Sequence, residues 1–164
     1  MRRMKDDALS LPLDDFERAL HEEFPGHERD WAENVRLTLT GILQALRDHT
    51  ANAEGEDGLL SEVDLTRPSL VRGVSELQRE HLDFVQEAAG LQADIENAVQ
   101  AFKPADPGAP PTALPEPKPP TVTIPDFGTL RQRGEDLAAA LHHHKDEEAK
   151  LMIESVTTDL GAGD

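Results

Sequence analysis

The sequence predicts an all-α fold, a bundle of four helices with a long proline-rich loop between its third and fourth helices. Three observations support this prediction. The chain is rich in Glu, Leu, Ala and Gln, which favour helices, and it has no Tyr and few other aromatic residues. Apolar residues recur at steps of three and four, as they do on the buried face of a helix. Nine of the twelve prolines fall within residues 103–125, where neither a helix nor a central strand can form.

Glycine and proline set the limits of four expected helices, at 14–24, 28–54, 68–102 and 127–156. The first ends at Pro25, and the second ends where Gly55 and Gly58 interrupt it. The segment GLLSEV that follows is expected to continue the second helix after a kink. Pro68 suits the first turn of the third helix, and Asp126 suits the N-cap of the fourth.

Length and composition predict one domain, because 164 residues is a typical size for a single hydrophobic core. We expect an N-terminal tail at 1–12 and a single helical bundle domain at 13–160. Within that domain, 103–126 is expected to form an extended connector. The connector is either a spacer or a ligand for a proline-recognition domain.

The charge and the residue content exclude several classes of function. With 33 acidic and 16 basic residues the formal charge is −17, which disfavours nucleic acid and anionic membranes as partners. No run of 18 apolar residues and no signal-peptide pattern occur, so a cytoplasmic protein without a membrane partner is expected. There is no cysteine, so any metal must be held by histidine and carboxylate.

Each of the three long helices is expected to have one histidine in its apolar stripe: His49, His81 and His144. A single histidine on an apolar face is more often a hydrogen-bonded core residue than a ligand. These three, however, are predicted to share one level. His49 and His81 are equally far along the sequence from Leu65, which lies in the expected turn. They therefore share a level, provided that the second helix continues through GLLSEV. His81 and His144 are equidistant from the middle of the connector, so all three are predicted to converge on one layer.

In the segment LHHHKDEE, only one of the three adjacent histidines shares the apolar stripe. His144 is in register with Leu141, whereas His142 and His143 lie about 200° and about 100° around the helix and are expected to be solvated. Glu148, four residues after His144, lies on the same face, so an imidazole and a carboxylate can meet one cation. A buried glutamate is costly without a partner, which favours a metal or a paired base at this position.

These segments together resemble the bacterial hemerythrin-like family, also called the HHE cation-binding domain. The resemblance rests on LQALRDHTANAEGEDGLLSEV, PSLVRGVSELQREH and LAAALHHHKDEE, and on the order of the histidines helix by helix. It implies an up-down four-helix bundle around a carboxylate-bridged di-iron centre that binds oxygen or senses oxygen, nitric oxide or iron. The metal ligands that it implies are His49, His81, and His144 with Glu148.

Two further residues are ligand candidates, because the chain departs from the family's pattern. Ala53 stands where the second helix would have the Glu of H-x-x-x-E, and Glu54 lies about 140° around the helix from His49. Glu54 therefore reaches the site only if the helix rewinds locally. On the first helix His21 is the candidate, and the third helix has no second histidine. This incomplete set of ligands is compatible with a centre of two metal ions, with a single ion, or with a bundle that binds no metal.

Non-haem iron suits mixed histidine and carboxylate ligation with an open position best, and manganese and zinc are the alternatives. The open position is expected to take a small diatomic ligand. Because the sequence has no evident general acid or base, binding or sensing is favoured over catalysis. Peroxidase- or oxidase-like di-iron chemistry stays an open alternative. A ferritin-like site would need Glu-x-x-His pairs and a zinc protease would need H-E-x-x-H, and neither occurs.

The alternative from a different class is a metal-free helical interaction protein. Such a protein would bind a basic protein partner through its acidic surface or its proline-rich loop. This hypothesis accounts for the charge and the connector. It does not account for three inward histidines at one level.

Overall fold

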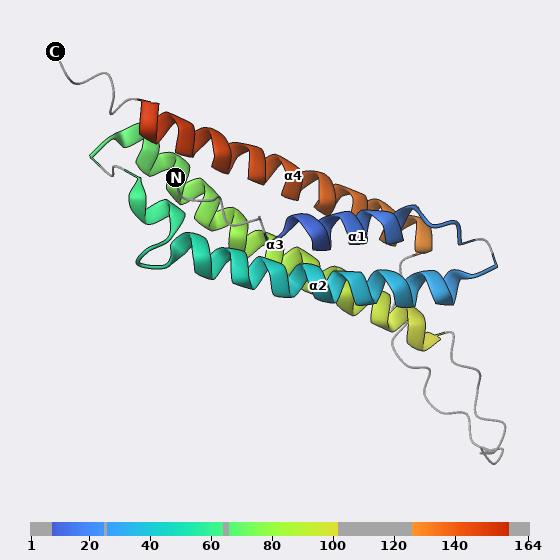
Figure 1. Ribbon diagram of the computed structural model, residues 1–164. Helices are drawn as coiled ribbons and strands as arrows, with labels where there is room; N and C mark the ends of the chain where they lie inside the picture. The colour runs from blue at the N-terminus through green and yellow to red at the C-terminus, as the bar shows by residue number, and fades with distance from the viewer. Residues whose placement is uncertain (1–7, 25, 64–65, 102–125, 158–164) are drawn as a thin grey trace, which may run out of the picture.

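The computed structural model describes residues 8–24, 26–63, 66–101 and 126–157, which contain four α-helices and no β-strand (Figure 1). The all-α prediction is confirmed for these ranges. The elements are α1 (Ser10–His21), α2 (Glu28–Glu54), the 3-10 helix η1 (Leu59–Glu62), α3 (Pro68–Ala101) and α4 (Phe127–Thr157). The connector predicted at 103–126 lies outside the described residues, apart from Asp126.

Helix α1 begins earlier and ends earlier than expected, at Ser10 and His21. Leu9 is fully buried, so the apolar stripe extends into the segment predicted as an N-terminal tail. The Ser10 hydroxyl accepts a hydrogen bond from Lys145 of α4, and Leu20 packs directly on Gly134. Helix α1 therefore runs along α4 in the opposite direction.

Helix α2 ends at Glu54, as predicted, but the expected continuation through GLLSEV is wrong. Gly55 adopts an extended conformation with ψ 167°, and residues 59–62 form a separate 3-10 helix. The chain turns back so tightly that a Cβ on Gly58 would lie 2.4 Å from the carbonyl oxygen of Ala53. The reversal therefore starts directly after Glu54, because glycine permits this close approach of backbone to backbone.

Asp126 caps α4, as predicted. Its Oδ1 accepts a hydrogen bond from the backbone N–H of Thr129 at 2.9 Å, and its Oδ2 accepts one from the Thr129 hydroxyl at 2.8 Å. The backbone bond is the main reason why the pKa of Asp126 is lowered. The ring of Phe127, in the first turn, then packs against Phe24 and Trp31 with centroids 6.0 and 5.9 Å away. This aromatic group closes one end of the bundle.

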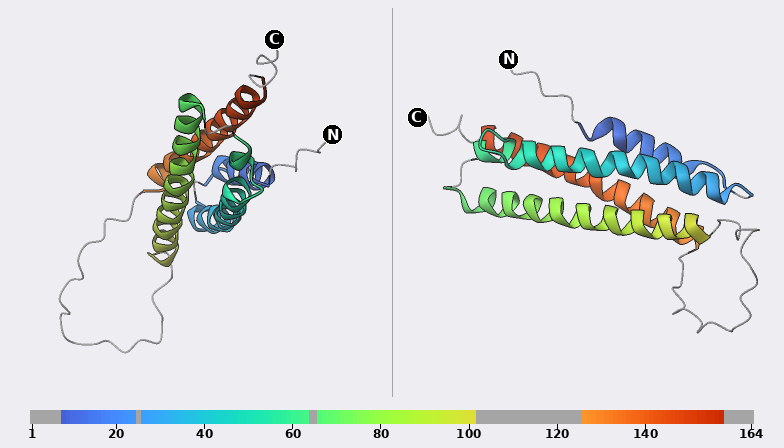
Figure 2. Two further views of the ribbon diagram at one scale, coloured as in Figure 1. Left: turned by 90° about the vertical axis from the view of Figure 1, so that its left-hand side faces the viewer. Right: turned by 90° about the horizontal axis from the view of Figure 1, so that it is seen from below.

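The helices lie lengthwise against one another and form a helical bundle. Contacts join α2 to α3, α3 to α4, and α1 to both α2 and α4. Figure 2 shows the short helix α1 on one side of the molecule, away from α3. Because α1 is short, it covers only the part of the bundle that is remote from η1 (Figure 1). None of the described helices is both long enough and apolar enough to cross a membrane.

The apolar core has two separate parts. The larger part joins all four helices and includes Phe16, Trp31, Ile95 and Leu130. The smaller part lies where α2 ends and α3 begins, and it consists of Ala53, Leu60, Val63, Leu70, Val74, Leu77 and Leu151. Each fully buried leucine contributes about 2 kcal/mol to the stability of the fold. Both apolar parts therefore hold the helices firmly together on either side of the layer that separates them.

One histidine on each long helix lies at the boundary between the two parts. His49 falls between Leu46 and Ala53 along α2. The equivalent places on α3 and α4 are taken by His81 and His144. The bundle therefore contains one polar layer between two apolar regions.

Candidate metal centre

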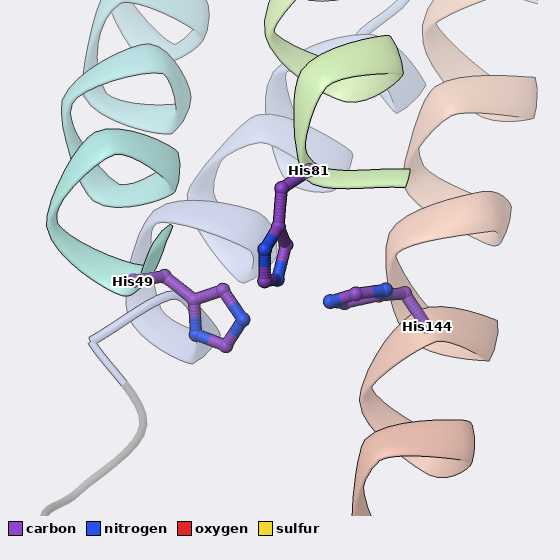
Figure 3. A group of neighbouring side chains, drawn as sticks. All are labelled: His49, His81 and His144. Atoms are coloured by element: carbon purple, nitrogen blue, oxygen red, sulfur yellow. The ribbon is translucent and has the colours of Figure 1, made fainter. Parts of the chain in front are cut away.

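Histidines from α2, α3 and α4 meet in this polar layer, and Figure 3 shows their three rings pointing toward one another. The ring centroids of His49 and His81 lie 5.1 Å apart, and those of His81 and His144 lie 4.7 Å apart. The third pair, His49 and His144, is separated by 5.7 Å. The predicted convergence is therefore confirmed. It survives the loss of the predicted helix extension, because the reversal through η1 still places the end of α2 beside the start of α3.

The spacing of the ring nitrogens is close to that required by a metal ion. The three rings offer nitrogens that lie within 4.8 Å of one another. Two nitrogens on opposite sides of one ion, each at about 2.1 Å, are about 4.2 Å apart. A small movement of the side chains therefore brings all three nitrogens onto one ion.

The hydrogen bonding of the rings also fits a metal. His81 and His144 are 1% and 0% exposed. Within the described residues, the Nε2 atoms of these two rings make no hydrogen bond. Buried polar atoms are nearly always paired, so the two inward nitrogens are in a position to bind a ligand at the centre of the layer.

Glu148 adds a carboxylate to the same layer. It lies one turn beyond His144 on α4 and is only 9% exposed. Its Oε2 lies 3.5 Å from Nε2 of His49, so it reaches toward the histidine of α2. An imidazole nitrogen and a carboxylate oxygen at this separation can bind the same cation. The described residues thus bring His49, His81, His144 and Glu148 together.

Two more carboxylates contact the histidine rings from the outer side. Oε1 of Glu54 lies 2.7 Å from Nδ1 of His81, and Oε2 of Glu80 lies 2.7 Å from Nδ1 of His144. Glu54, a predicted ligand, is therefore at the site, but it contacts a histidine nitrogen that faces away from the centre. The helix does not rewind at its end, so the side chain extends across to α3 instead.

Burial is the largest influence on His144, and it lowers the pKa of that imidazole below its usual value. The hydrogen bond with Glu80 opposes this effect. The neighbouring rings of His81 and His49 act in the same direction as burial, because positive charges in one small space repel one another. The net result favours the neutral imidazole, which is the form that binds a metal ion.

Phe84 covers the layer on the side between α3 and α4. Its ring meets that of His144 nearly edge to face, with centroids 5.3 Å apart. Phe84 also lines a groove of about 620 Å³, whose walls include Glu87, Arg133 and Leu137. A small molecule in this groove therefore lies next to a ring that directly touches His144.

His21 is the predicted ligand that the structure does not bring to the cluster. It is the last residue of α1, it is exposed, and its Nδ1 lies 2.7 Å from the backbone oxygen of Glu17. The preceding residue, Leu20, packs on Gly134. That contact is ten residues, or about 15 Å along α4, from His144. His21 lies far from the cluster because α1 runs away from the histidine layer from its first turn onward.

Glu80 is the residue of this site that the sequence did not reveal. It precedes His81 directly, so the helical period turns it about 100° away from the apolar stripe, where acids are usually solvated. Its partner, His144, is 64 residues away along the chain. The one available signal is the dipeptide Glu-His itself, which places an acid beside a buried imidazole. That signal does not show which neighbouring helix the acid meets.

No protein-family model, no curated protein and no solved structure matches this chain. The candidate site is therefore supported by its own geometry and donor atoms. Three buried or half-buried imidazoles with a nearby carboxylate form a cluster that can hold a metal ion. Imidazole with carboxylate suits iron, zinc and manganese, whereas calcium and magnesium prefer oxygen ligands alone.

Proposed function

We propose that this protein is a hemerythrin-like non-haem iron protein, in which His49, His81, His144 and Glu148 hold one metal ion. The observation that carries the proposal is the meeting of three histidines in a buried layer. Two of them direct Nε2 atoms inward that have no hydrogen-bond partner among the described residues. Iron is proposed because it suits mixed imidazole and carboxylate ligation with an open position, and manganese and zinc are the competing ions.

One ion is proposed instead of the two that the family resemblance implies. Carboxylate-bridged two-metal centres in helical bundles use about six side chains. The described residues bring three imidazoles and one inward carboxylate, that of Glu148, to the layer. Glu54 contacts the outer nitrogen of His81, and His21 lies elsewhere. This donor set is sufficient for one ion with a vacant coordination position.

The finer features of the proposed fold are an up-down order of the helices and a proline-rich loop from α3 to α4. Three observations support them. Helices α2 and α3 are joined by the short reversal through η1, and they pack together along their length. Helix α1 runs in the direction opposite to α4. The residues that separate α3 from α4 in the sequence contain most of the prolines.

When bound, an Fe(II) ion would supply an open coordination position for a diatomic ligand such as oxygen or nitric oxide. The protein's own residues provide the setting. The apolar parts of the core exclude water on both sides of the layer, and Phe84 covers His144 on the side of the groove. Among the residues that the structure describes, the titratable groups that face the centre are all assigned as ligands. Binding or sensing is therefore the proposed role, in preference to catalysis.

Metal analysis of protein purified without an affinity tag tests this proposal, because a histidine tag would itself bind metal. After anaerobic loading with Fe(II) and removal of free metal, we expect one ion per chain. Two ions per chain would instead support the di-iron centre. If neither iron, zinc nor manganese binds stoichiometrically, the metal proposal is refuted and a metal-free interaction protein becomes the better hypothesis.

Substitutions locate the ion. His81→Ala and His144→Ala are each expected to abolish stoichiometric loading, since each removes one of three imidazoles. His143→Ala is the matched control: His143 is the exposed neighbour of His144 on the same helix, and its loss should leave the metal content unchanged. Equal losses in all three variants would show that the metal is not bound at this layer.

A further inference from the structure

We propose that Glu54 and Glu80 are positioning residues that hold His81 and His144 as the tautomers protonated on Nδ1, so that both Nε2 lone pairs face the centre before a metal arrives. This assignment rests on the proposed metal site and names the residues that prepare it. It adds two acids from two different helices that orient ligands without binding the metal themselves.

The two hydrogen bonds define which ring nitrogen has the proton. A carboxylate oxygen can only accept a hydrogen bond, so Nδ1 of each ring must be the donor. The distance is 2.7 Å in both cases, which is at the short end expected for a bond to a charged acceptor. A neutral imidazole has only one N–H, so Nε2 of His81 and of His144 then has a free lone pair.

Burial makes this arrangement hard to reverse. The side chains of His81 and His144 are 1% and 0% exposed, whereas those of Glu54 and Glu80 are 32% and 39% exposed. If a ring turned over or changed its tautomer, its hydrogen bond to the carboxylate would be lost at a place where the ring itself has almost no exposed surface. The two acids thus connect the buried rings to the surface and select one orientation of each.

The arrangement is repeated from helix to helix. Helix α2 supplies the ligand His49 and, with Glu54, orients the ligand of α3. Helix α3 supplies His81 and, with the adjacent Glu80, orients the ligand of α4, His144. Because successive residues of a helix are about 100° apart, Glu80 and His81 can face two different neighbours at once. Each of these two helices therefore supplies one histidine ligand and one glutamate that orients the histidine of the next helix.

Nitrogen-15 NMR of the metal-free protein tests the tautomers directly. With a chelator present and at a pH where the rings are neutral, His81 and His144 should both give the shifts of an imidazole protonated on Nδ1. Glu80→Ala should change the spectrum of His144 and leave that of His81, and Glu54→Ala should do the reverse. This crossed pattern would not arise from a general loosening of the bundle.

Two further variants keep the test independent of misfolding. Glu80→Gln retains an oxygen acceptor, so the tautomer of His144 should be preserved. Glu76→Ala is the matched control, because Glu76 lies one turn before Glu80 on α3 and pairs with Arg72 instead. Zn²⁺ affinity should fall about 10- to 100-fold in Glu54→Ala and in Glu80→Ala, should recover in part in Glu80→Gln, and should not change in Glu76→Ala.

The outcomes separate this assignment from the metal proposal. If either wild-type ring is protonated on Nε2, or if the crossed pattern is absent, the positioning role is wrong even when the wild type binds metal. If the crossed pattern is present but wild-type protein binds no metal, the two acids do set the tautomers and the metal function is what fails.

Discussion

Burial separates His144 from the two histidines that precede it in the sequence. His142 and His143 are exposed, and His142 lies 3.1 Å from a carboxylate oxygen of Glu17 on α1. The ring of His144 is completely buried. Adjacent residues of a helix point about 100° apart, so three identical side chains occupy three different environments. Only one of the three imidazoles therefore lies in the dry interior, where it can act as a ligand.

Lowering the pH is expected to destabilise the metal-free protein through His144. Because its pKa is lowered in the folded state, the unfolded chain binds a proton that the folded chain does not, once the pH falls below about 6.5. The free energy of unfolding should therefore decrease by up to about 1.4 kcal/mol per pH unit below that value. The groups that face or adjoin this ring are Glu80 and His81 on α3, His49 on α2 and Glu148 on α4.

Urea unfolding in the presence of a chelator, at about pH 7.5 and about pH 5.5, measures this effect. His144→Leu has a side chain of similar size that cannot be protonated, so its free energy of unfolding should depend less on pH than that of the wild type. His143→Gln should behave like the wild type, because His143 is exposed. The same pH dependence in both variants would show that His144 is not the group responsible.

At the level of elements, the end of α2 is the critical feature, because it determines where Glu54 lies. A Cβ on Gly58 would be 2.4 Å from the carbonyl oxygen of Ala53 and 2.7 Å from that of Asn52. These are backbone atoms, which can move only if the last turn of α2 distorts. Gly58→Ala is therefore expected to lower the free energy of unfolding by about 1–3 kcal/mol and to weaken metal binding.

Gly41→Ala is the control for this prediction. Gly41 lies in the middle of α2, and an added Cβ would have no atom within 4 Å. Alanine favours a helix over glycine, so this variant should be more stable by up to about 1 kcal/mol. Urea unfolding of both variants measures the contrast. If Gly58→Ala is also stabilising, the tight packing of the turn on α2 does not constrain the protein.

At the level of the whole molecule, the histidine layer is a polar interruption between two apolar parts of the core. It makes folding of the metal-free chain less favourable than a continuous apolar core would. A metal ion in this layer would tie α2, α3 and α4 together. The layer therefore lowers the stability of the metal-free state, and a bound ion would offset that loss.

Metal should consequently stabilise the folded protein. At a free concentration 100-fold above its dissociation constant, an ion that binds only the folded state adds about 2.7 kcal/mol to the free energy of unfolding. Thermal unfolding with and without Zn²⁺ measures this as a rise in Tm. His81→Ala should show no such rise, whereas the exposed-site variant His143→Ala should show the full rise. A rise of equal size in His81→Ala would place the ion elsewhere.

Local sequence rules are sufficient to predict much of this structure. The steps of three and four that predict helices also predict that His49, His81, His144 and Glu148 face inward, because the helical period alone decides this. The same rules could not place His21 correctly. Its position depends on the direction in which α1 runs along α4, and that direction is decided by packing between residues far apart in the chain, such as Leu20 and Gly134.

By itself, the sequence determined the helices, the buried side of each one and the one histidine of each long helix that faces inward, since periodicity is a local property. The level at which these histidines meet depends on how the chain reverses after α2, which the tertiary structure decides. Only the tertiary structure decided which side chains Glu54 and Glu80 contact. Both residues lie off the apolar stripes, and each finds its histidine across a gap between two helices. The rotation of neighbouring helices about their axes sets such contacts, and it results from the packing of the whole core.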